Sequence, residues 1–474
     1  MLDIKDKKDI MDQEENGLES FKRAYFVGAG GIGMANLERY LLKNGFEIGG
    51  YDRTPSDLTH TLEKEGVVIT YTDSQSEIPE KFRNPDETLV VFTPAVPKDS
   101  EMLNWFQDNG FQVVKRSELL GKITRSGKSI CVAGSHGKTT TCSMIANILR
   151  DSEIGCNAFL GGILRNIGSN LVMCKGSEWS VIEADEYDRS FHRLSPFIAV
   201  VTSVDPDHLD IYGDEEGYLE GFAHFTSLIK EGGTLLMHEG LKLKPRLKDG
   251  VKLFTYSGGD KGDWHAEDIK FGDGKISFTL VGPDVRIEGL EPGVPVEINI
   301  DNAVAAAAAS LLAGASPEEV KKGLKEFRGA KRRFEVILPG ESGEALIDDY
   351  AHSPNEVRAS IRSVKRLYPG RKLTVIFQPH LYSRTRDFAE GFSEALSEAD
   401  EVIMPEIYPA RELPIPGVDS NLILNSVVCG SKTYCERKDL LNLIKNRKFD
   451  VLMTLGAADI DILLPQIEEI LKNR

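Results

Sequence analysis

The chain has 474 residues, of which 41% are hydrophobic and 28% charged, and its formal net charge at pH 7 is -17. This length predicts about two to four domains, of which we expect three, with enough apolar residues to build their cores. The negative charge argues against a nucleic-acid partner or a membrane-surface protein, although glycine loops and helix N-termini can still bind an anionic small ligand.

Several features predict a reduced, cytoplasmic protein. Residues 1–20 are polar, so we interpret them as a loose leader and not as a signal peptide. The most apolar run, residues 303–315, is too short to cross a bilayer, and we expect no membrane insertion. The cysteines show no metal-type spacing; they are Cys131, Cys142, Cys156, Cys174, Cys429 and Cys435. The oligomeric state stays open between a monomer and a dimer.

The predicted elements alternate between strands and helices from the N-terminus onward, which is typical of α/β proteins with mostly parallel sheets. In such sheets ligands lie at the carboxyl ends of the strands. A segment at 251–298 differs, because its pattern predicts a small antiparallel sheet with a hairpin at Asp273-Gly274. The other strands are expected at residues 24–28, 47–52, 89–94, 129–134, 179–185, 198–205, 373–379, 401–406 and 450–456.

We place the domain boundaries where this pattern is interrupted. Residues 1–126 and 334–474 are each expected to form a Rossmann-like α/β domain. Residues 127–333 are expected to form a central P-loop-type domain, with a mostly parallel sheet plus the small antiparallel one.

A glycine loop follows the first predicted strand. Its glycines have G-x-G-x-x-G spacing, a helical pattern follows, and the next strand ends at Asp52. Such glycines let the backbone approach a phosphate, and an acidic residue at this offset suits a ribose hydroxyl. Taken alone, the motif predicts an NAD site, with a glycine-rich packing turn as the alternative. The candidate binding residues are Gly28, Ala29, Gly30, Gly31, Ile32, Gly33 and Asp52.

A second glycine loop follows the strand at 129–134. It lacks the first glycine of a standard Walker loop, whose place Val132 takes, but keeps G-x-x-G-K-T before a helical pattern. Backbone amides of such a loop surround the β- and γ-phosphates, Lys138 would bridge them, and the Thr139 hydroxyl would reach Mg²⁺. A capped helix start is the alternative. The candidate triphosphate residues are Gly134, Ser135, His136, Gly137, Lys138, Thr139 and Thr140.

Two clusters of carboxylates end nearby strands and could hold the magnesium of such a site. Mg²⁺ prefers carboxylate oxygens to histidine nitrogens, so His208 is a weak metal candidate on this ground. The alternative is that His208 is a polar histidine in a turn. The clusters are Glu183, Asp185, Glu186 and Asp188, and Asp205, Asp207, His208 and Asp210.

Together these motifs resemble those of the Mur ligases, and within that family most closely the first ligase of the series. The resemblance covers nearly the whole chain. It is carried by GAGGIGM (28–34), GSHGKTTT (134–141), EADEYDRSF (183–191), DPDHLDIYG (205–213), NIDNAVAAAAA (299–309), FRGAKRRFE (327–335), DDYAHSPNE (348–356), FQPHLYSRTRDF (377–388), EIYPARE (406–412) and GAADID (456–461).

The resemblance implies what each domain binds. The first loop would bind UDP-N-acetylmuramate instead of NAD, the second would bind ATP, and the third domain would bring in L-alanine. The implied reaction joins L-alanine to the lactyl carboxylate through an acyl phosphate, releasing ADP and phosphate, in cytoplasmic peptidoglycan precursor synthesis. Two magnesium sites are implied.

The resemblance also implies roles for single residues. Thr139 and Glu183 would hold one magnesium, and His208 a second. For Asn299 and Asn302 the alternative is helix capping, which would account for one of the two. For His352 the alternative is a hydrogen bond within its loop. The catalytic candidates are Lys138, His208, His352 and Arg384. The further ATP contacts are Asn299, Asn302, Arg333 and Asp349, and Thr93 would contact the uridine. The amino-acid end would be lined by Tyr350, His352 and Arg384.

Two positions depart from the family pattern. Many members have histidine where this chain has Ser353, which we expect to cap a helix with Glu356 in a capping box. Some members have arginine where this chain has Leu381, so alanine binding would depend more on Arg384.

Other functions remain as alternatives. A recycling ligase that attaches a preformed tripeptide ranks second, because the loop after EADE is short here. An NAD-dependent dehydrogenase and a nucleotide-switch or scaffold protein rank lower. The sequence leaves the preference among alanine, serine and glycine open.

Overall fold

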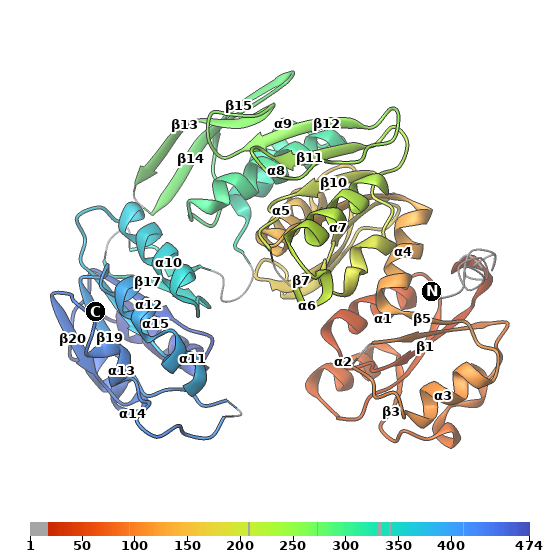
Figure 1. Ribbon diagram of the computed structural model, residues 1–474, viewed down its shortest axis with the longest axis horizontal. Helices are drawn as coiled ribbons and strands as arrows, with labels where there is room; N and C mark the ends of the chain where they lie inside the picture. Colours follow the sequence, from red (N-terminus) through yellow and green to blue (C-terminus); the bar gives the residue numbers. More distant parts are fainter. Residues whose placement is uncertain are drawn as a thin grey trace.

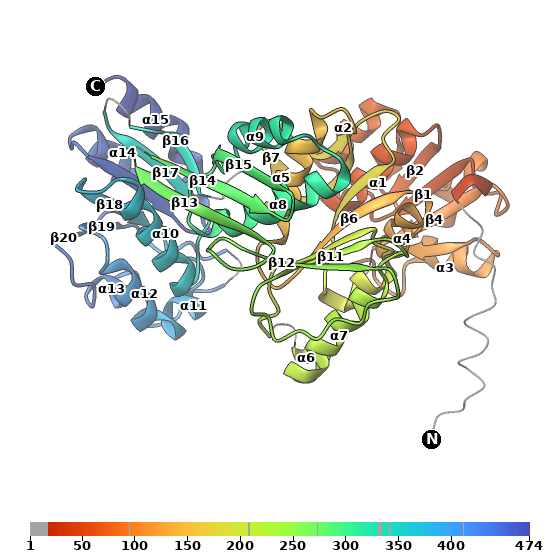
Figure 2. The same cartoon turned by 90° about the horizontal axis from the view of Figure 1, so that it is seen from above.

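The computed structural model describes residues 18–93, 95–206, 209–272, 274–329, 334–340, 343–410 and 412–474. Its strands form three sheets, of five, ten and six strands in chain order. The ten-stranded sheet lies in the middle of an arc, with the other two blocks at its ends (Figure 1). The view from above shows the same order along the long axis (Figure 2).

The first block is a parallel sheet in the order β3-β2-β1-β4-β5. Its central strand β1 (Arg23–Val27) is buried from Ala24 onward, because the sheet has helices on its faces. The remaining elements are β2 (Glu47–Tyr51), β3 (Val68–Thr70), β4 (Thr88–Phe92), β5 (Val113–Lys115), α1 (Ile32–Lys43), α2 (Asp57–Glu65), α3 (Glu101–Asp108) and α4 (Arg116–Ser126).

The central block has the strand order β15-β14-β13-β12-β11-β10-β6-β9-β7-β8. Its strands are β6 (Lys128–Ala133), β7 (Asn157–Leu164), β8 (Ser169–Met173), β9 (Trp179–Glu183), β10 (Ile198–Val201), β11 (Thr234–His238), β12 (Lys252–Ser257), β13 (Trp264–Gly272), β14 (Lys275–Gly282) and β15 (Val285–Leu290). Its helices are α5 (Lys138–Arg150), α6 (Leu209–Tyr212), α7 (Glu215–Ser227), α8 (Ile298–Ala313) and α9 (Pro317–Glu326).

The segment predicted as a small antiparallel sheet needs two corrections. Strands β13, β14 and β15 are antiparallel, but β12 pairs with β11 in parallel. The antiparallel ladder also continues the main sheet, because Tyr256 and Ser257 of β12 pair in parallel with Trp264 and His265 of β13. The hairpin between β13 and β14 is present, with Gly272 opposite Lys275; Asp273 lies outside the described residues.

The most apolar run of the chain forms the buried helix α8. Residues 303–309 of this helix are fully buried, and six of them are alanine. These small side chains let α5 pack closely against α8. The helix that follows the second glycine loop is therefore held from behind by the core of the central block.

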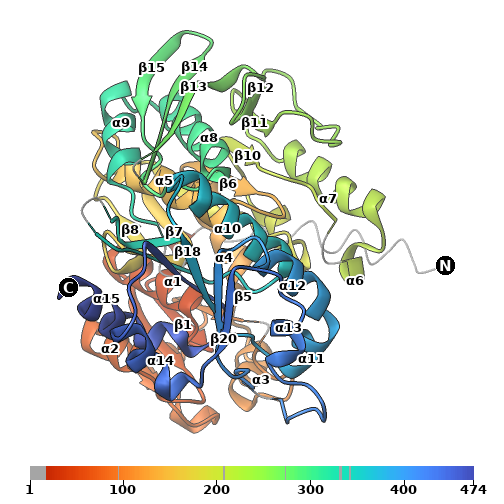
Figure 3. The same ribbon diagram turned by 90° about the vertical axis from the view of Figure 1, so that its left-hand side faces the viewer.

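The third block has the order β16-β17-β21-β18-β19-β20, parallel except for the edge strand β16. Ser353 caps α10 in the predicted capping box with Glu356. Figure 3 shows this block end-on. Its elements are β16 (Glu335–Leu338), β17 (Ala345–Asp349), β18 (Leu373–Phe377), β19 (Glu401–Met404), β20 (Ser431–Tyr434), β21 (Val451–Leu455), α10 (Pro354–Leu367), α11 (Tyr382–Asp387), α12 (Ala389–Leu396), α13 (Asn421–Leu424), α14 (Arg437–Lys445) and α15 (Leu464–Lys472).

Each predicted strand outside 251–298 is present, which confirms an α/β fold with three mostly parallel sheets. Within the described residues, none of the helices combines the length and the apolar character needed to span a bilayer.

Candidate functional site

The second glycine loop connects the end of β6 to the first turn of α5. Gly137 has a φ of +81°, and a Cβ at this position would lie 2.8 Å from Oδ1 of Asn302 on α8. Glycine is therefore required both by the left-handed backbone and by the close approach of α8. The loop is a tightly packed strand-to-helix turn with backbone amides at the start of a helix, which is an anion-binding geometry.

Lys138 lies in the first turn of α5 and is held by two acceptors. Its Nζ donates to the carbonyl of Gly134 at 2.5 Å and to Oε1 of Glu186 at 2.9 Å, and lies 2.8 Å from Oε2. The Glu186 side chain is only 2% exposed. A buried carboxylate thus fixes the lysine beside the loop. The sequence marked Glu186 as a strand-end acid, but no spacing rule paired it with Lys138.

Thr139 and Glu183 meet as predicted. The Thr139 hydroxyl donates to Oε1 of Glu183 at 2.8 Å, and the amide of Gly161 donates to Oε2 at 3.1 Å. Burial raises the pKa of the Glu183 carboxyl, and these two hydrogen bonds and Lys138 oppose that shift. A hydroxyl and a carboxylate at the phosphate loop form an oxygen donor set that suits Mg²⁺.

The strand β10 and the turn after it support the loop from the other side. The Ser135 hydroxyl donates to the carbonyl of Asp205 at 2.6 Å, and the His136 amide donates to the Ser203 hydroxyl at 2.8 Å. These contacts fix the loop where the two strand ends meet. The predicted metal residue His208 lies outside the described residues.

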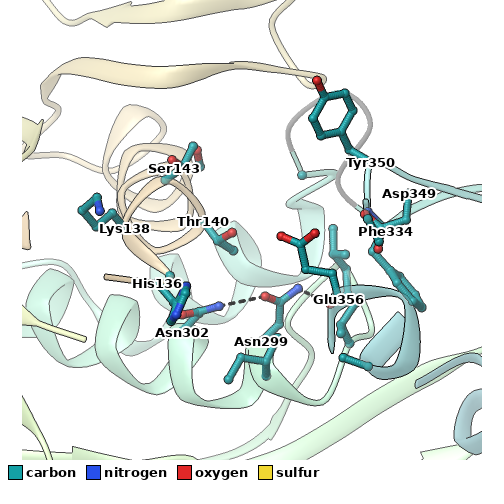
Figure 4. A pocket seen from close by; sticks show the side chains of 18 of the residues that line it. His136, Lys138, Thr140, Ser143, Asn299, Asn302, Phe334, Asp349, Tyr350 and Glu356 are labelled. Atoms are coloured by element: carbon teal, nitrogen blue, oxygen red, sulfur yellow. Dashed lines mark hydrogen bonds between the residues drawn. The ribbon is translucent and has the colours of Figure 1, made fainter. Parts of the chain in front are cut away.

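A cavity of about 520 Å³ opens between this loop and the third block (Figure 4). Asn302 donates from Nδ2 to Oδ1 of Asn299 at 2.9 Å, and its Oδ1 accepts from the Thr141 hydroxyl at 3.1 Å. Both asparagines are buried and neither caps α8, so the capping alternative is wrong. The cavity also has an apolar wall that the sequence analysis missed, formed by Val294, Val296, Ile298, Phe327 and Phe334.

The third block contributes Asp349 and Tyr350 to the same cavity. Oδ1 of Asp349 accepts from the amide of Phe334 at 3.1 Å, and Oδ2 accepts from the Ser360 hydroxyl. The structure thus brings the predicted ribose residue to the cavity wall opposite the phosphate loop. Arg333 lies outside the described residues.

His352 and Arg384 are not among the residues that line this cavity, although His352 directly follows the lining residue Ala351. Nδ1 of His352 hydrogen-bonds the Tyr350 carbonyl at 3.0 Å, as in the alternative that we gave for it. Burial lowers the pKa of His380, and the positive charge of Arg384 adds to this effect. Within the described chain no ion pair engages the Arg384 guanidinium, so it is available to a carboxylate.

The first glycine loop lies at the carboxyl end of β1. The amide of Gly30 donates to Oδ2 of Asp52 at 2.6 Å, so the acidic residue binds the loop itself in this structure. Thr93 packs against Gly28, where a Cβ would lie 2.6 Å from its methyl carbon. The residues that we predicted for this loop, including Thr93 and Asp52, are therefore all gathered at one edge of the first sheet.

A smaller cavity, of about 180 Å³, lies between the first glycine loop and the end of β9. Its lining includes Gly33 of the first loop, Arg116 at the start of α4, Glu183 at the end of β9 and Asp185 after it. Glu183 also lines the larger cavity beside Lys138 and Thr139. A single extended ligand anchored at the first loop could therefore reach the second, and Glu183 marks the point where the two cavities meet.

Comparisons with known proteins agree along the chain. Residues 23–128, 132–310 and 332–457 match the models for the Mur ligase family catalytic domain, the Mur ligase middle domain and the Mur ligase glutamate ligase domain. The chain is 54% identical over 447 residues to UDP-N-acetylmuramate–L-alanine ligase of Parabacteroides distasonis, covering 94% of this chain and 96% of that relative.

Solved structures give the same fold. The crystal structure of UDP-N-acetylmuramate–alanine ligase from Thermotoga maritima matches with a TM-score of 0.72 at 27% identity, covering 95% of this chain and 99% of that one. A murein peptide ligase from Psychrobacter arcticus matches with a TM-score of 0.57 at 21% identity over 96% of this chain and 99% of that one, which shows a shared fold alone.

Proposed function

This chain belongs to the Mur ligase family, and on that premise we propose that it joins L-alanine to the lactyl carboxylate of UDP-N-acetylmuramate at the expense of ATP. The observation that carries the proposal is the pair of cavities that share Glu183, one beginning at each glycine loop. A sugar nucleotide held at the first loop would thereby present its acid to a triphosphate held at the second.

The chemistry proceeds in two steps. The lactyl carboxylate attacks the γ-phosphate of ATP, ADP leaves, and an acyl phosphate forms. The amine of alanine then attacks the acyl carbonyl, phosphate leaves with the electron pair of the broken bond, and the amine loses a proton. The acyl phosphate hydrolyses in water, so the blocks must close over it. Positioning and charge neutralisation supply most of the rate.

Each group of residues has a distinct part in this reaction. Lys138 would neutralise the phosphate as it moves from ADP to the carboxylate. Asn299 and Asn302 would bind the adenine side of ATP next to the apolar wall, and Asp349 the ribose. Arg384, with Tyr350 and His352 beside it, would bind the carboxylate of alanine in a bidentate fork. Arg333 completes the predicted ATP contacts.

Thr139 and Glu183 fit a magnesium ion, because their oxygens already converge at the phosphate loop. Among the described residues no three acidic, histidine or cysteine side chains form a metal cluster, so most ligands would be phosphate oxygens and water. The ion would neutralise charge on the phosphates when bound. We place a second magnesium at His208.

We further propose that the domains are residues 1–126, which bind the UDP-sugar, 127–333, which bind ATP, and 334–474, which bind the amino acid. The first and third each hold one sheet, and the central one holds the ten-stranded sheet. The cysteines of the described chain are free, in agreement with a cytoplasmic location.

The decisive experiment is an amino-acid panel with ATP and UDP-N-acetylmuramate, read by phosphate release. Release should depend on both the sugar nucleotide and L-alanine, with serine and glycine as weaker or equal substrates. Release that requires a tripeptide in place of alanine would identify the recycling ligase. Nicotinamide binding without ATP-dependent product would identify a dehydrogenase.

A further inference from the structure

A second large cavity lies behind the nucleotide cavity, on the far side of Val294 and Phe334, which line both. It has a volume of about 390 Å³. Its walls come from the central block and from the first residues of the third block, including Val336 on β16 and Pro339. It therefore lies at the junction of two blocks that must move relative to each other during a catalytic cycle.

The lining of this cavity is positively charged, although the chain as a whole carries -17. Arg165, Lys275, Lys325 and Arg328 line it, against Glu291 as the one acidic residue of the described lining. These cations come from the turn after β7, from the start of β14, and from the end of α9 and the segment after it. Because separate elements bring them together, the charge is not the by-product of one basic run.

Internal pairing with carboxylates cancels only part of this charge. Lys325 pairs with Glu291 at 3.3 Å, and Arg165 pairs with Glu335 at 3.0 Å. The Nη1 of Arg328 donates to the carbonyls of Lys325 and Phe327, which carry no charge. Among the described residues, no carboxylate therefore neutralises Arg328 at the cavity edge.

The remaining walls are apolar. They contain three prolines and four further apolar side chains, which leave no uncharged hydrogen-bonding side chain in the described lining. We infer that this cavity binds a small organic anion, with its carboxylate or phosphate against the cations and its apolar body against the wall formed by Pro292, Pro295, Pro339, Ile276, Val294 and Val336.

Phe334 connects this cavity to the nucleotide cavity. Its φ of +44° is strained for a side chain of this size, and it is 5% exposed. Its amide donates to Oδ1 of Asp349, which lines the nucleotide cavity. An anion packed against Phe334 would change the position of this residue and of Asp349, so binding at the two cavities is coupled, with the same factor in both directions.

The test uses anilinonaphthalene sulfonate, an aromatic anion whose fluorescence rises in an apolar site, with the full-length protein in the presence and absence of saturating ADP and Mg²⁺. We expect a saturable site that persists with ADP bound. Lys325→Glu and Arg328→Glu should each weaken it about tenfold, as expected for the loss of one charge-assisted contact. Lys322→Glu, on the same helix but outside the cavity lining, is the matched control.

A charge swap, Lys325→Glu with Glu291→Lys, keeps the net charge and should restore binding, which separates electrostatics from a folding defect. Full displacement of the probe by ADP would assign this space to the nucleotide site and overturn the proposal. Equal binding of the probe by Lys325→Glu, Arg328→Glu and Lys322→Glu would also overturn the proposal. If the probe leaves the ADP dissociation constant unchanged, the coupling through Phe334 is wrong. None of these readouts depends on ligase activity.

Discussion

At the scale of single residues, Glu38 on α1 is a buried acid outside the proposed chemistry. Its side chain is fully buried, and within the described residues neither carboxyl oxygen has a hydrogen-bond partner. Burial raises the pKa of Glu38 well above its usual value of 4.5. The folded protein therefore binds a proton that the unfolded chain releases above about pH 4.5, and stability falls as pH rises from there to the folded pKa.

This predicts the behaviour of Glu38→Gln, which removes the titration and keeps the shape. The variant should be more stable than the parent protein above about pH 4.5, by about 1.4 kcal/mol for each pH unit up to the folded pKa. Below about pH 4.5 the stabilities of the variant and the parent protein should converge. Melting temperatures across pH measure the difference, with Glu63→Gln on the exposed face of α2 as control. A difference that stays constant with pH would contradict the assignment.

The ion pair between Lys138 and Glu186 makes a second prediction at this scale. Lys138→Ala should lower turnover by about 10²–10³-fold, because the charge that stabilises the moving phosphate is lost. It should leave binding of the UDP-sugar nearly intact, since that ligand is anchored in the first block. It should also destabilise the protein by about 3 kcal/mol, because buried Glu186 loses its partner.

The double variant Lys138→Ala/Glu186→Gln separates these effects. It should regain most of the stability, as measured by chemical denaturation, while phosphate release stays low. A Lys138→Ala enzyme that makes product at the normal rate would remove the lysine from the ATP site.

At the scale of elements, the segment around Glu412 fixes the short helix α11, which carries Arg384. Oε2 of Glu412 accepts from the amide of Ser383 at 2.9 Å, and Oε1 accepts from the Ser383 hydroxyl at 2.5 Å. Leu381, which precedes the helix, has a φ of +69°, and its amide donates to the carbonyl of Tyr408 at 3.0 Å. Glu412 and Tyr408 of the EIYPARE motif therefore hold the start of α11, the helix that carries Arg384.

Glu412→Ala should accordingly raise the KM for alanine about tenfold with little change in the KM for ATP, since it frees the first turn of α11. Arg384→Ala should raise the KM for alanine further. In the double variant the two increases in KM should not add, because both substitutions act on one guanidinium. Initial rates over a range of alanine concentrations measure this. The control is Glu390→Ala on α12, and an unchanged alanine KM in Glu412→Ala would disprove the positioning role.

Elements with a strong local pattern could be predicted from the sequence. Buried parallel strands such as β1, β6 and β21 are continuous apolar runs, and the capping box of α10 is written in Ser353, Pro354 and Glu356. Edge strands such as β3 and β5 have three residues and no clear period, so they were missed. The parallel pairing of β12 depends on its neighbours in space and carries no local signal.

In the candidate site, too, local motifs predict some of the contacts, whereas others arise only from the packing of the blocks. Glycine loops and the Thr139–Glu183 contact follow from motifs, because strand ends bring those residues together. The pairing of Glu186 with Lys138 and the apolar wall at Val294 and Phe334 depend on how whole blocks pack. Short-range spacing cannot encode contacts of that kind.

At the scale of the whole molecule, the third block is tied to the hairpin of β13 and β14. The Arg366 guanidinium at the end of α10 lies 4.0 Å from the centre of the Phe271 ring and pairs with Glu297. The amide of Gly274 donates to the carbonyl of Leu367 at 3.3 Å. These contacts join α10 to the central block close to the nucleotide cavity, so they hold the orientation in which both blocks line it.

Arg366→Ala should therefore loosen the third block while leaving each block folded. In small-angle X-ray scattering the nucleotide-free variant should have a larger radius of gyration than the parent protein, and saturating ADP and Mg²⁺ should reduce the difference. The KM for ATP should rise about threefold, because part of the binding energy now orders the two blocks. Arg362→Ala is the matched control, since Arg362 lies on the same helix but pairs with Glu398 inside the third block. If both variants scatter like the parent, α10 and the hairpin do not set the angle between the blocks, and the nucleotide alone must draw them together.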